Sequence, residues 1–392
     1  MDNFIFQNPT RLIFGRGMIA QLASEIPADA RLMITFGGGS VKQNGVYDQV
    51  IAALKGREYV EFWGIEPNPT IETLRKAVAL GRTHNVNYLL AVGGGSVLDG
   101  TKLIGGAIPY QGDAWDLVKK GSFRDSLPAS SILTLPATGS EMNANGVISC
   151  LETKEKFAFT SLCPVFSILD PEVTFSLPKH QLACGLADTF VHVMEQYMTC
   201  PIGQSRLMDR WAEGILISLT EIAPEIIKIA DGEEVDAEHR YTLMSDFMIS
   251  ATMALNGFVS MGVRQDWATH MIGHELTALT GLTHGETLAI VLPALLRVLR
   301  QQKRPKLLQF GQRIWGVSAG PLDNCALQAI DHTENFFRSL GLRTRITEAV
   351  SEAEADAIIK EITTRFAARN SAFGEDANVD SRITEQILIA AR

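Results

Sequence analysis

Short apolar runs alternate with segments of helical periodicity in the first half of the chain. Runs of strand length fall at residues 31–36, 58–63, 88–92, 131–135 and 165–169. Helical spacing separates them, as at residues 46–54 and from Thr70, a candidate N-cap, to about His84. Strands this short and apolar suit a sheet that helices cover on both faces. The pattern therefore predicts a mostly parallel, Rossmann-like α/β domain at residues 1–180.

Beyond Pro178 the strand signals almost vanish, and long amphipathic segments replace them. These segments fall at residues 181–199, 204–223, 239–255, 266–279, 287–300, 326–340 and 352–368. The chain has 392 residues, which exceeds the usual size of one domain. We therefore expect a second, all-helical domain at residues 181–392.

The composition excludes several classes of protein. Hydrophobic residues make up 46% of the chain and charged residues 20%, as in a folded soluble enzyme rather than a disordered chain. The net charge is −9, and no basic run exceeds a pair such as Lys119 and Lys120, so nucleic-acid binding is not expected. The N-terminus has no signal-peptide pattern, and Pro293 and Arg297 interrupt the most apolar later segment, so no membrane span is expected.

The cysteines indicate a reducing environment. There are five of them, an odd number, and no two are spaced as Cys-x-x-Cys: Cys150, Cys163, Cys184, Cys200 and Cys325. This pattern favours free thiols and a cytoplasmic protein over a disulfide framework or a thiolate metal site. Any metal ion is then expected to use nitrogen and oxygen ligands.

Glycine-rich segments follow two of the predicted strands. Gly93, Gly94, Gly95 and Ser96 come after residues 88–92, and Gly37, Gly38, Gly39 and Ser40 come after residues 31–36. Such strand ends let backbone N–H groups approach a phosphate, although a tight turn that requires positive φ also explains a glycine triplet. A third strand end adds the hydroxyl groups of Thr138 and Ser140. In a doubly wound sheet these ends meet at one crevice, where such folds bind ligands.

Histidine spacing indicates a metal site in the second half. His270, His274 and His284 fall within 15 residues, and Asp188 and His192 form an i, i+4 pair upstream. One carboxylate with several imidazoles is a ligand set that suits zinc or ferrous iron with one position open for substrate. The alternative is that these histidines cap helices and bond to backbone carbonyls.

Taken together, these motifs resemble the iron-containing (group III) alcohol dehydrogenase family along the whole chain. The segments 9–15 and 265–270 are most similar to its branch of NADPH-dependent aldehyde reductases and butanol dehydrogenases. The resemblance implies that the α/β domain binds a dinucleotide and that the helical domain binds a metal ion and carries out catalysis.

The resemblance also assigns roles to particular residues. It implies four metal ligands, Asp188, His192, His270 and His284, and a nearby His274 that relays protons. It places the cofactor pyrophosphate on the segment from Gly93 to Ser96, with Asp99 toward the nicotinamide and Thr138 lining the cleft.

The resemblance bears on the choice of cofactor as well. Many relatives that use NAD carry an aspartate at the strand end where this chain has Gly38 and Gly39, and its absence favours NADP(H). Lys42 and Lys156 are candidates for contact with the additional phosphate. No arginine follows the glycines directly, which is a departure from the usual way of binding that phosphate.

The implied activity is the reduction of short-chain aldehydes to primary alcohols. The metal, zinc or iron, would polarise the carbonyl while NADPH delivers hydride. A homodimer is expected from the family alone. An alternative is a metal-dependent sugar-phosphate lyase resembling dehydroquinate synthase, or a metallohydrolase on the same ligands. Either would need no nicotinamide, and the ligand segments lack the basic residues that a phosphorylated substrate would require.

Overall fold

The chain divides into two compact units in the computed structural model, which describes residues 1–199 and 205–392. The α/β unit comprises residues 7–177 together with residues 236–256. The helical unit comprises the remaining described segments, residues 1–6, 178–235 and 257–392. Cys200 and the predicted helix start at Gln204 lie outside the described residues.

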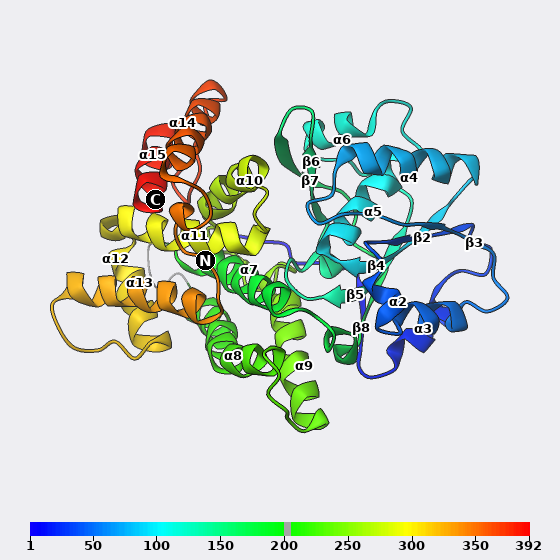
Figure 1. The fold of residues 1–392 in the computed structure, drawn as a ribbon, viewed down its shortest axis with the longest axis horizontal. Helices are drawn as coiled ribbons and strands as arrows, with labels where there is room; N and C mark the ends of the chain where they lie inside the picture. The colour runs from blue at the N-terminus through cyan, green and yellow to red at the C-terminus, as the bar shows by residue number, and fades with distance from the viewer. Residues whose placement is uncertain (200–204) are drawn as a thin grey trace. The chain divides into compact units, whose positions relative to one another are not determined.

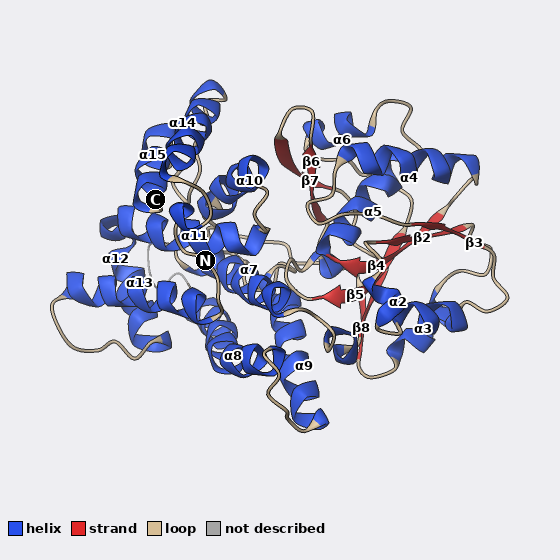
Figure 2. Cartoon of the chain, in the orientation of Figure 1, coloured by secondary structure: helices blue, strands red, loops and turns tan. Residues whose placement is uncertain are grey.

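The α/β unit is built on a six-stranded parallel sheet, which confirms the predicted architecture (Figure 2). Its strands are β1 (Arg11–Phe14), β2 (Leu32–Phe36), β3 (Tyr59–Phe62), β4 (Tyr88–Gly94), β5 (Ala129–Leu135) and β8 (Phe166–Leu169). The order across the sheet is β1-β8-β5-β4-β2-β3. Two further strands, β6 (Asn145–Cys150) and β7 (Glu155–Thr160), form a separate antiparallel hairpin. The sequence pattern predicted neither β1 nor this hairpin.

Helices cover both faces of the sheet, as the apolar strands require (Figure 1). The elements α1 (Leu22–Glu25) and α3 (Val46–Ala53) contribute to the core on one face, and α4 (Ile71–Thr83), α5 (Gly95–Ala107) and α6 (Ala114–Lys120) to the core on the other. Alternate strand residues point into the two cores, as Leu89 and Leu90 of β4 do. The predicted N-cap of α4 is confirmed, because the Thr70 side chain accepts a hydrogen bond from Thr73 N.

The order of the strands places the two glycine-rich segments side by side. Strands β2 and β4 are neighbours, with Phe36 opposite Val92. After β2 the chain continues to the edge strand β3, whereas after β4 it continues to β5 on the other side. This reversal is the topological switch point at which open α/β sheets bind ligands.

The helical unit contains no strand among its described residues. Its helices are α7 (Lys179–Tyr197), α8 (Arg206–Ala230), α10 (Ala268–Thr280), α11 (His284–Val298), α12 (Arg300–Ile314), α13 (Leu322–Ser339), α14 (Glu352–Ala368) and α15 (Ser381–Ala390). The pattern predicted six of them, and α14 matches both bounds. It did not predict α15, nor α12, which is strongly basic and contains Pro305.

One helix from the second half of the sequence packs with the α/β unit. Helix α9 (Ala237–Ala254) and its flanking residues belong to that unit. The Thr252 hydroxyl donates to the Glu141 carboxylate, and the Arg240 guanidinium donates to Phe175 O. The sequence pattern predicts this segment as part of the helical domain, because periodicity indicates a helix but not the core against which it packs.

None of the helices in the described part of the chain combines the length and the hydropathy that a bilayer span requires.

Candidate active site

Three imidazole rings surround one carboxylate in the helical unit. Asp188 Oδ1 lies 3.4 Å from His192 Nδ1, 3.7 Å from His270 Nε2 and 3.9 Å from His284 Nε2. Asp188, His192 and His270 are buried, and His284 is about one-fifth exposed. The structure thus brings together the four residues that the resemblance named as metal ligands.

Close helix packing produces this arrangement. Asp188 and His192 lie one turn apart on α7, and His270 lies in the first turn of α10. Gly281 ends α10 in a left-handed conformation, and His284 is the first residue of α11. A Cβ atom on Gly285 would collide with Cys184 O, so glycine allows the start of α11 to press against α7.

The spacing of these atoms fits a divalent cation. Ligand atoms at about 2.0–2.2 Å from a tetrahedral ion are separated by roughly 3.3–3.6 Å. The separations from Asp188 Oδ1 lie in or slightly above this range, and they exceed the usual length of an N–H···O hydrogen bond. One anionic and three neutral ligands form a set that zinc and ferrous iron both accept.

A second carboxylate orients the His270 ring. His270 Nδ1 lies 2.8 Å from Glu195 Oε2, and Glu195 Oε1 accepts a hydrogen bond from Thr269 N at 2.6 Å. Burial disfavours the charged ring, but the Glu195 and Asp188 carboxylates outweigh it and raise the pKa of His270 to about 9. With Nδ1 engaged by Glu195, Nε2 faces Asp188, where a bound cation would replace the proton. Sequence reasoning missed Glu195, although its position seven residues after Asp188 places both on one helix face.

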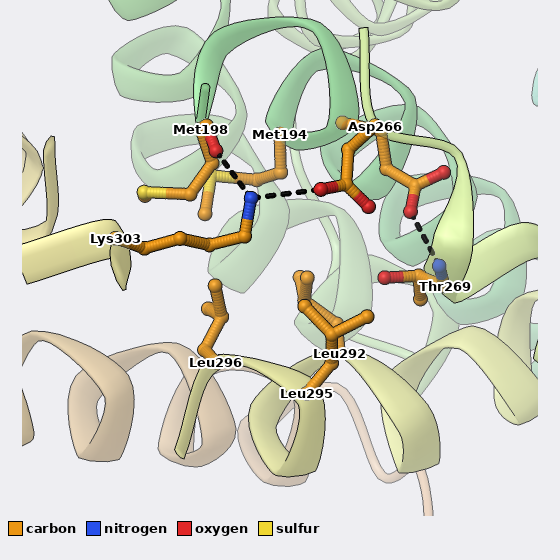
Figure 3. A pocket seen from close by; sticks show the side chains of 9 residues that line it. Met194, Met198, Asp266, Thr269, Leu292, Leu295, Leu296 and Lys303 are labelled. Atoms are coloured by element: carbon orange, nitrogen blue, oxygen red, sulfur yellow. Dashed lines mark hydrogen bonds and ion pairs between the residues drawn. The ribbon is translucent and has the colours of Figure 1, made fainter. Parts of the chain in front are cut away.

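A buried lysine, Lys303, directs its amine at Asp266 and Met198 (Figure 3). Lys303 Nζ donates to Asp266 Oδ2 at 2.8 Å, to Met198 O at 2.9 Å and to Glu375 Oε1 at 3.1 Å. Burial disfavours the ammonium form, but the two carboxylates outweigh that penalty and raise the pKa of Lys303. The lysine is therefore a buried cation with its charge compensated.

Asp266 connects this lysine to the metal-ligand region. Asp266 Oδ1 accepts from Ala268 N at 3.0 Å, and Asp266 N donates to Glu195 O at 2.9 Å. The aspartate thus joins the first turn of α10, which carries His270, to the part of α7 that carries Glu195. We call Lys303, Asp266 and Glu375 the brace. No local sequence pattern indicates it, because its members are far apart along the chain.

Two more side chains border the histidine cluster. His274 is buried, with its ring centroid 5.1 Å from that of His284 and 6.3 Å from that of His270. The group of residues whose ligand atoms all lie within 4.8 Å of one another is Asp188, His192 and His270, and it includes neither His284 nor His274. Trp267, which precedes α10 in a left-handed conformation (φ 62°), places its ring 5.2 Å from His270. Sequence reasoning used Trp267 only as part of the family-like segment 265–270 and gave its ring no role.

The glycines at the end of β4 are required by packing. None of Gly93, Gly94 and Gly95 has positive φ, so the tight-turn alternative is wrong for this triplet. A Cβ atom on Gly94 would lie 3.1 Å from the Leu135 side chain, and one on Gly95 would collide with Thr138. Ser96 follows in the first turn of α5. The backbone at this strand end therefore lies directly against the third loop.

The glycines at the end of β2 have different surroundings. A Cβ atom on Gly38 or Gly39 would meet no atom within 4 Å, and only Gly39 has positive φ (104°). Gly37 is more confined, because its Cβ would lie 3.3 Å from Ile65 O. Ser40 begins the short helix α2 (Ser40–Gln43). The turn at Gly38 and Gly39 therefore has open space beside it.

Asp99 and Ser140 are engaged with each other. Ser140 Oγ donates to Asp99 Oδ1 at 2.6 Å and accepts from Lys102 Nζ at 2.7 Å, and Asp99 Oδ2 accepts from Val147 N. Burial raises the pKa of Asp99 and lowers that of Lys102 to about 8. These contacts fix the loop after β5 on α5, which holds Thr138 over Gly95. A cofactor contact for Asp99 or Ser140 remains a prediction.

Lys156 lies on the hairpin, in β7. It is buried, and its Nζ donates to Asn68 Oδ1 at 2.8 Å. Its contact with a cofactor phosphate also remains a prediction.

Comparison with known proteins identifies the family. Residues 9–171 match the family model described as "Iron-containing alcohol dehydrogenase". Residues 182–376 match the model described as "Fe-containing alcohol dehydrogenase family, C-terminal". The chain belongs to the iron-containing alcohol dehydrogenase family. It is therefore an oxidoreductase of the alcohol dehydrogenase and aldehyde reductase type, and the comparisons give no support to the lyase or hydrolase alternatives.

Several members of the iron-containing alcohol dehydrogenase family match along the whole chain. The NADPH-dependent aldehyde reductase YqhD of Escherichia coli K12 is 46% identical, with 100% of both chains covered. Its crystal structure has a TM-score of 0.93 and covers 100% of this chain and 99% of that one. A probable NADH-dependent butanol dehydrogenase 1 of Bacillus subtilis is 40% identical, again with both chains fully covered. The structure of NADH-dependent butanol dehydrogenase A from Thermotoga maritima is 34% identical, with a TM-score of 0.91 and coverage of 100% and 99%.

Proposed function

We propose that this enzyme reduces short-chain aldehydes to primary alcohols with NADPH and one divalent metal ion, zinc or iron. The observation that carries the proposal is the group of three imidazole nitrogens within 3.9 Å of Asp188 Oδ1. Asp188, His192, His270 and His284 would hold the ion. The names of the relatives, an aldehyde reductase and two butanol dehydrogenases, support this class of substrate.

Each group of residues has a defined part in this chemistry. When bound, the metal ion supplies a Lewis acid for the carbonyl oxygen, and NADPH supplies the hydride. Glu195 keeps the Nε2 atom of His270 directed at the ligand cluster. His274 lies beside His284, and imidazole can exchange a proton near neutral pH. We propose His274 as the group that supplies the proton to the alcohol product.

The open strand end at Gly38 supports NADPH as the cofactor. No carboxylate stands there to repel a 2′-phosphate, and the structure leaves room for that group. Because the relatives are named for both NADPH and NADH, this residue-level argument decides our proposal. The pyrophosphate would lie along Gly93, Gly94, Gly95 and Ser96, at the start of the 13-residue helix α5.

A single substitution tests the cofactor assignment. Gly38→Asp meets no steric obstacle and needs no positive φ, so the variant is expected to fold normally. Its carboxylate would repel the 2′-phosphate, and we expect the ratio of kcat/KM for NADPH to that for NADH to fall at least tenfold. Steady-state kinetics with both cofactors measure this ratio, and Gly38→Asn, which adds the same bulk without charge, is the matched control. An unaltered enzyme that prefers NADH would contradict the assignment.

The reaction class is tested with the metal-loaded protein. Butanal and NADPH should give butanol with one NADPH oxidised per aldehyde, and removal of the metal by a chelator should abolish turnover. Metal-dependent turnover of aldehyde without NADPH oxidation would contradict the proposal. Metal analysis of the purified protein distinguishes zinc from iron.

Two further proposals concern the protein as a whole. We propose a cytoplasmic enzyme, which the described cysteines support because all four are free thiols: Cys150, Cys163, Cys184 and Cys325. We also propose a homodimer, an expectation from the family that light scattering of the purified protein would test.

A further inference from the structure

An aromatic cluster flanks the end of strand β2. The rings of Phe36, the last residue of β2, and Trp63 are stacked, with centroids 4.0 Å apart and planes inclined by 11°. Tyr47, from α3, completes the cluster with its ring centroid 5.6 Å from that of Trp63 and 5.8 Å from that of Phe36. One face of the Trp63 ring is therefore fixed against the sheet.

A carboxylate fixes the orientation of two of these rings. Trp63 Nε1 donates to Glu61 Oε2 at 2.7 Å, and the Tyr47 hydroxyl donates to Glu61 Oε1 at 2.9 Å. Both carboxylate oxygens are engaged, so neither ring can turn without losing a charge-assisted hydrogen bond.

The other face of Trp63 carries a cation. Lys42 Nζ lies 4.1 Å from the centroid of the Trp63 ring and 5.2 Å from that of Tyr47, a cation–π arrangement. Lys42 is exposed, and across residues 1–199 and 205–392 it forms no ion pair with a carboxylate. Its positive charge is thus held in place but not neutralised, and its remaining N–H groups can donate to an anion.

The backbone places this cluster beside the open turn. Gly64 N donates to Gly37 O at 3.2 Å, so the residue after Trp63 bonds to the residue before Gly38. Lys42 N donates to Gly39 O at 3.0 Å. The Cβ positions of Gly38 and Gly39 face open space. The lysine and its aromatic support therefore border the position at which the proposed function places the 2′-phosphate.

We propose that Trp63, with Tyr47 and Glu61, positions Lys42 to bind the 2′-phosphate of NADPH, and that Trp63 thereby contributes to cofactor specificity. The inference rests on the proposed use of NADPH. A lysine side chain loses rotamer freedom when it pairs with a phosphate, and a ring that already orders the lysine reduces this cost. The chain thus has a lysine supported by aromatic rings where other NADP-binding sites use an arginine.

Direct binding measurements test this inference without metal or turnover. The dissociation constants of NADPH and NADH would be measured by cofactor fluorescence for the unaltered protein and three variants. We expect Lys42→Gln to weaken NADPH binding about tenfold. We expect Trp63→Leu to weaken it about two- to fivefold, the size of an exposed cation–π contact, and Trp63→Phe to weaken it less. NADH affinity should stay within about twofold in every variant, because NADH lacks the 2′-phosphate.

Other outcomes would overturn the inference in distinct ways. Equal losses for NADPH and NADH in Trp63→Leu would assign the ring to adenine stacking. Unchanged NADPH affinity in Lys42→Gln would remove the lysine from the phosphate site, and this exposed substitution is not expected to impair folding. If the unaltered protein prefers NADPH and all three variants bind both cofactors as tightly as it does, this inference alone fails. If the unaltered protein shows no such preference, the cofactor assignment of the proposed function fails with it.

Discussion

Asp188 is the residue on which the proposed metal site depends most, because it supplies the only anionic ligand. Asp188→Asn keeps the shape of the side chain and removes its charge. Loss of a residue that only hydrogen-bonds to a metal ligand typically lowers metal affinity about 10–100-fold, so we expect the loss of the ligand's own charge to lower it at least as much. Metal analysis after equilibrium dialysis measures the loss. Asp48→Asn, on the exposed side of α3, is the matched control. A fully loaded Asp188→Asn protein would contradict the assignment.

His274 differs from its neighbours in the role that it is expected to have. It lies beside the cluster but is not one of the four proposed ligands, so His274→Ala should retain the metal. Removing a proton donor should lower kcat for aldehyde reduction about 10²-fold. Metal content and kcat would be measured on the same preparation, with the exposed His84→Ala as control. Loss of the metal from the His274 variant would instead make it a ligand.

The sequence pattern singled out five candidate residues, from which the family resemblance selected four ligands, but it did not indicate the residues that support them. Asp188 and His192 show helical spacing, and His270 clusters with two other histidines, so local pattern was sufficient. Glu195 and Lys303 carry no comparable signal, since acidic and basic residues are common on helices and usually face solvent. Their burial results from the packing of α7, α10 and α12 against one another, which a local sequence pattern does not show.

At the scale of elements, the brace sets the position of the start of α10. Lys303→Met removes the cation that holds Asp266, and we expect metal affinity to fall about tenfold as His270 loses its fixed position. Competition with a chelator measures this affinity. Lys306→Met is a matched control, because Lys306 is an equally buried lysine of α12 that pairs with Asp209 instead. Equal loss of metal affinity in both variants would mean that α12 as a whole, and not the brace, supports the site.

The elements themselves were predicted unevenly. The pattern located strand β4, which is a continuous apolar run, and helix α14, whose buried residues recur at helical spacing. The hairpin of β6 and β7 mixes apolar residues with Gly146 and polar residues without a regular alternation, and its partial burial arises from contacts with α5 and α6. The glycine triplet at β4 was located correctly, but the reason for its glycines is close packing against Thr138, which a sequence does not display.

At the scale of the whole molecule, a buried acid links stability to pH. Glu141 is fully buried, and burial raises its pKa above the ordinary value of 4.5. A raised folded-state pKa adds stability below the ordinary pKa, and this contribution disappears as the pH rises through the raised value. Glu141→Gln does not titrate, so its melting temperature relative to the unaltered protein should increase with pH above 4.5, by roughly 2 °C or more. Calorimetry of both proteins from pH 4.5 to 8 measures the difference, and a difference that stays constant across this range would contradict the expectation.

The path of the chain between the two units has a consequence for recombination. The chain passes from one unit to the other after Phe6, Leu177, Val235 and Asn256. In a chimera of two related proteins, a single breakpoint near Leu177 would therefore combine the sheet and loops of one protein with helix α9 of the other. The contact between Thr252 and Glu141 would then have to match across the two proteins. Successful chimeras with relatives should accordingly exchange residues 236–256 together with residues 7–177, as one inherited module.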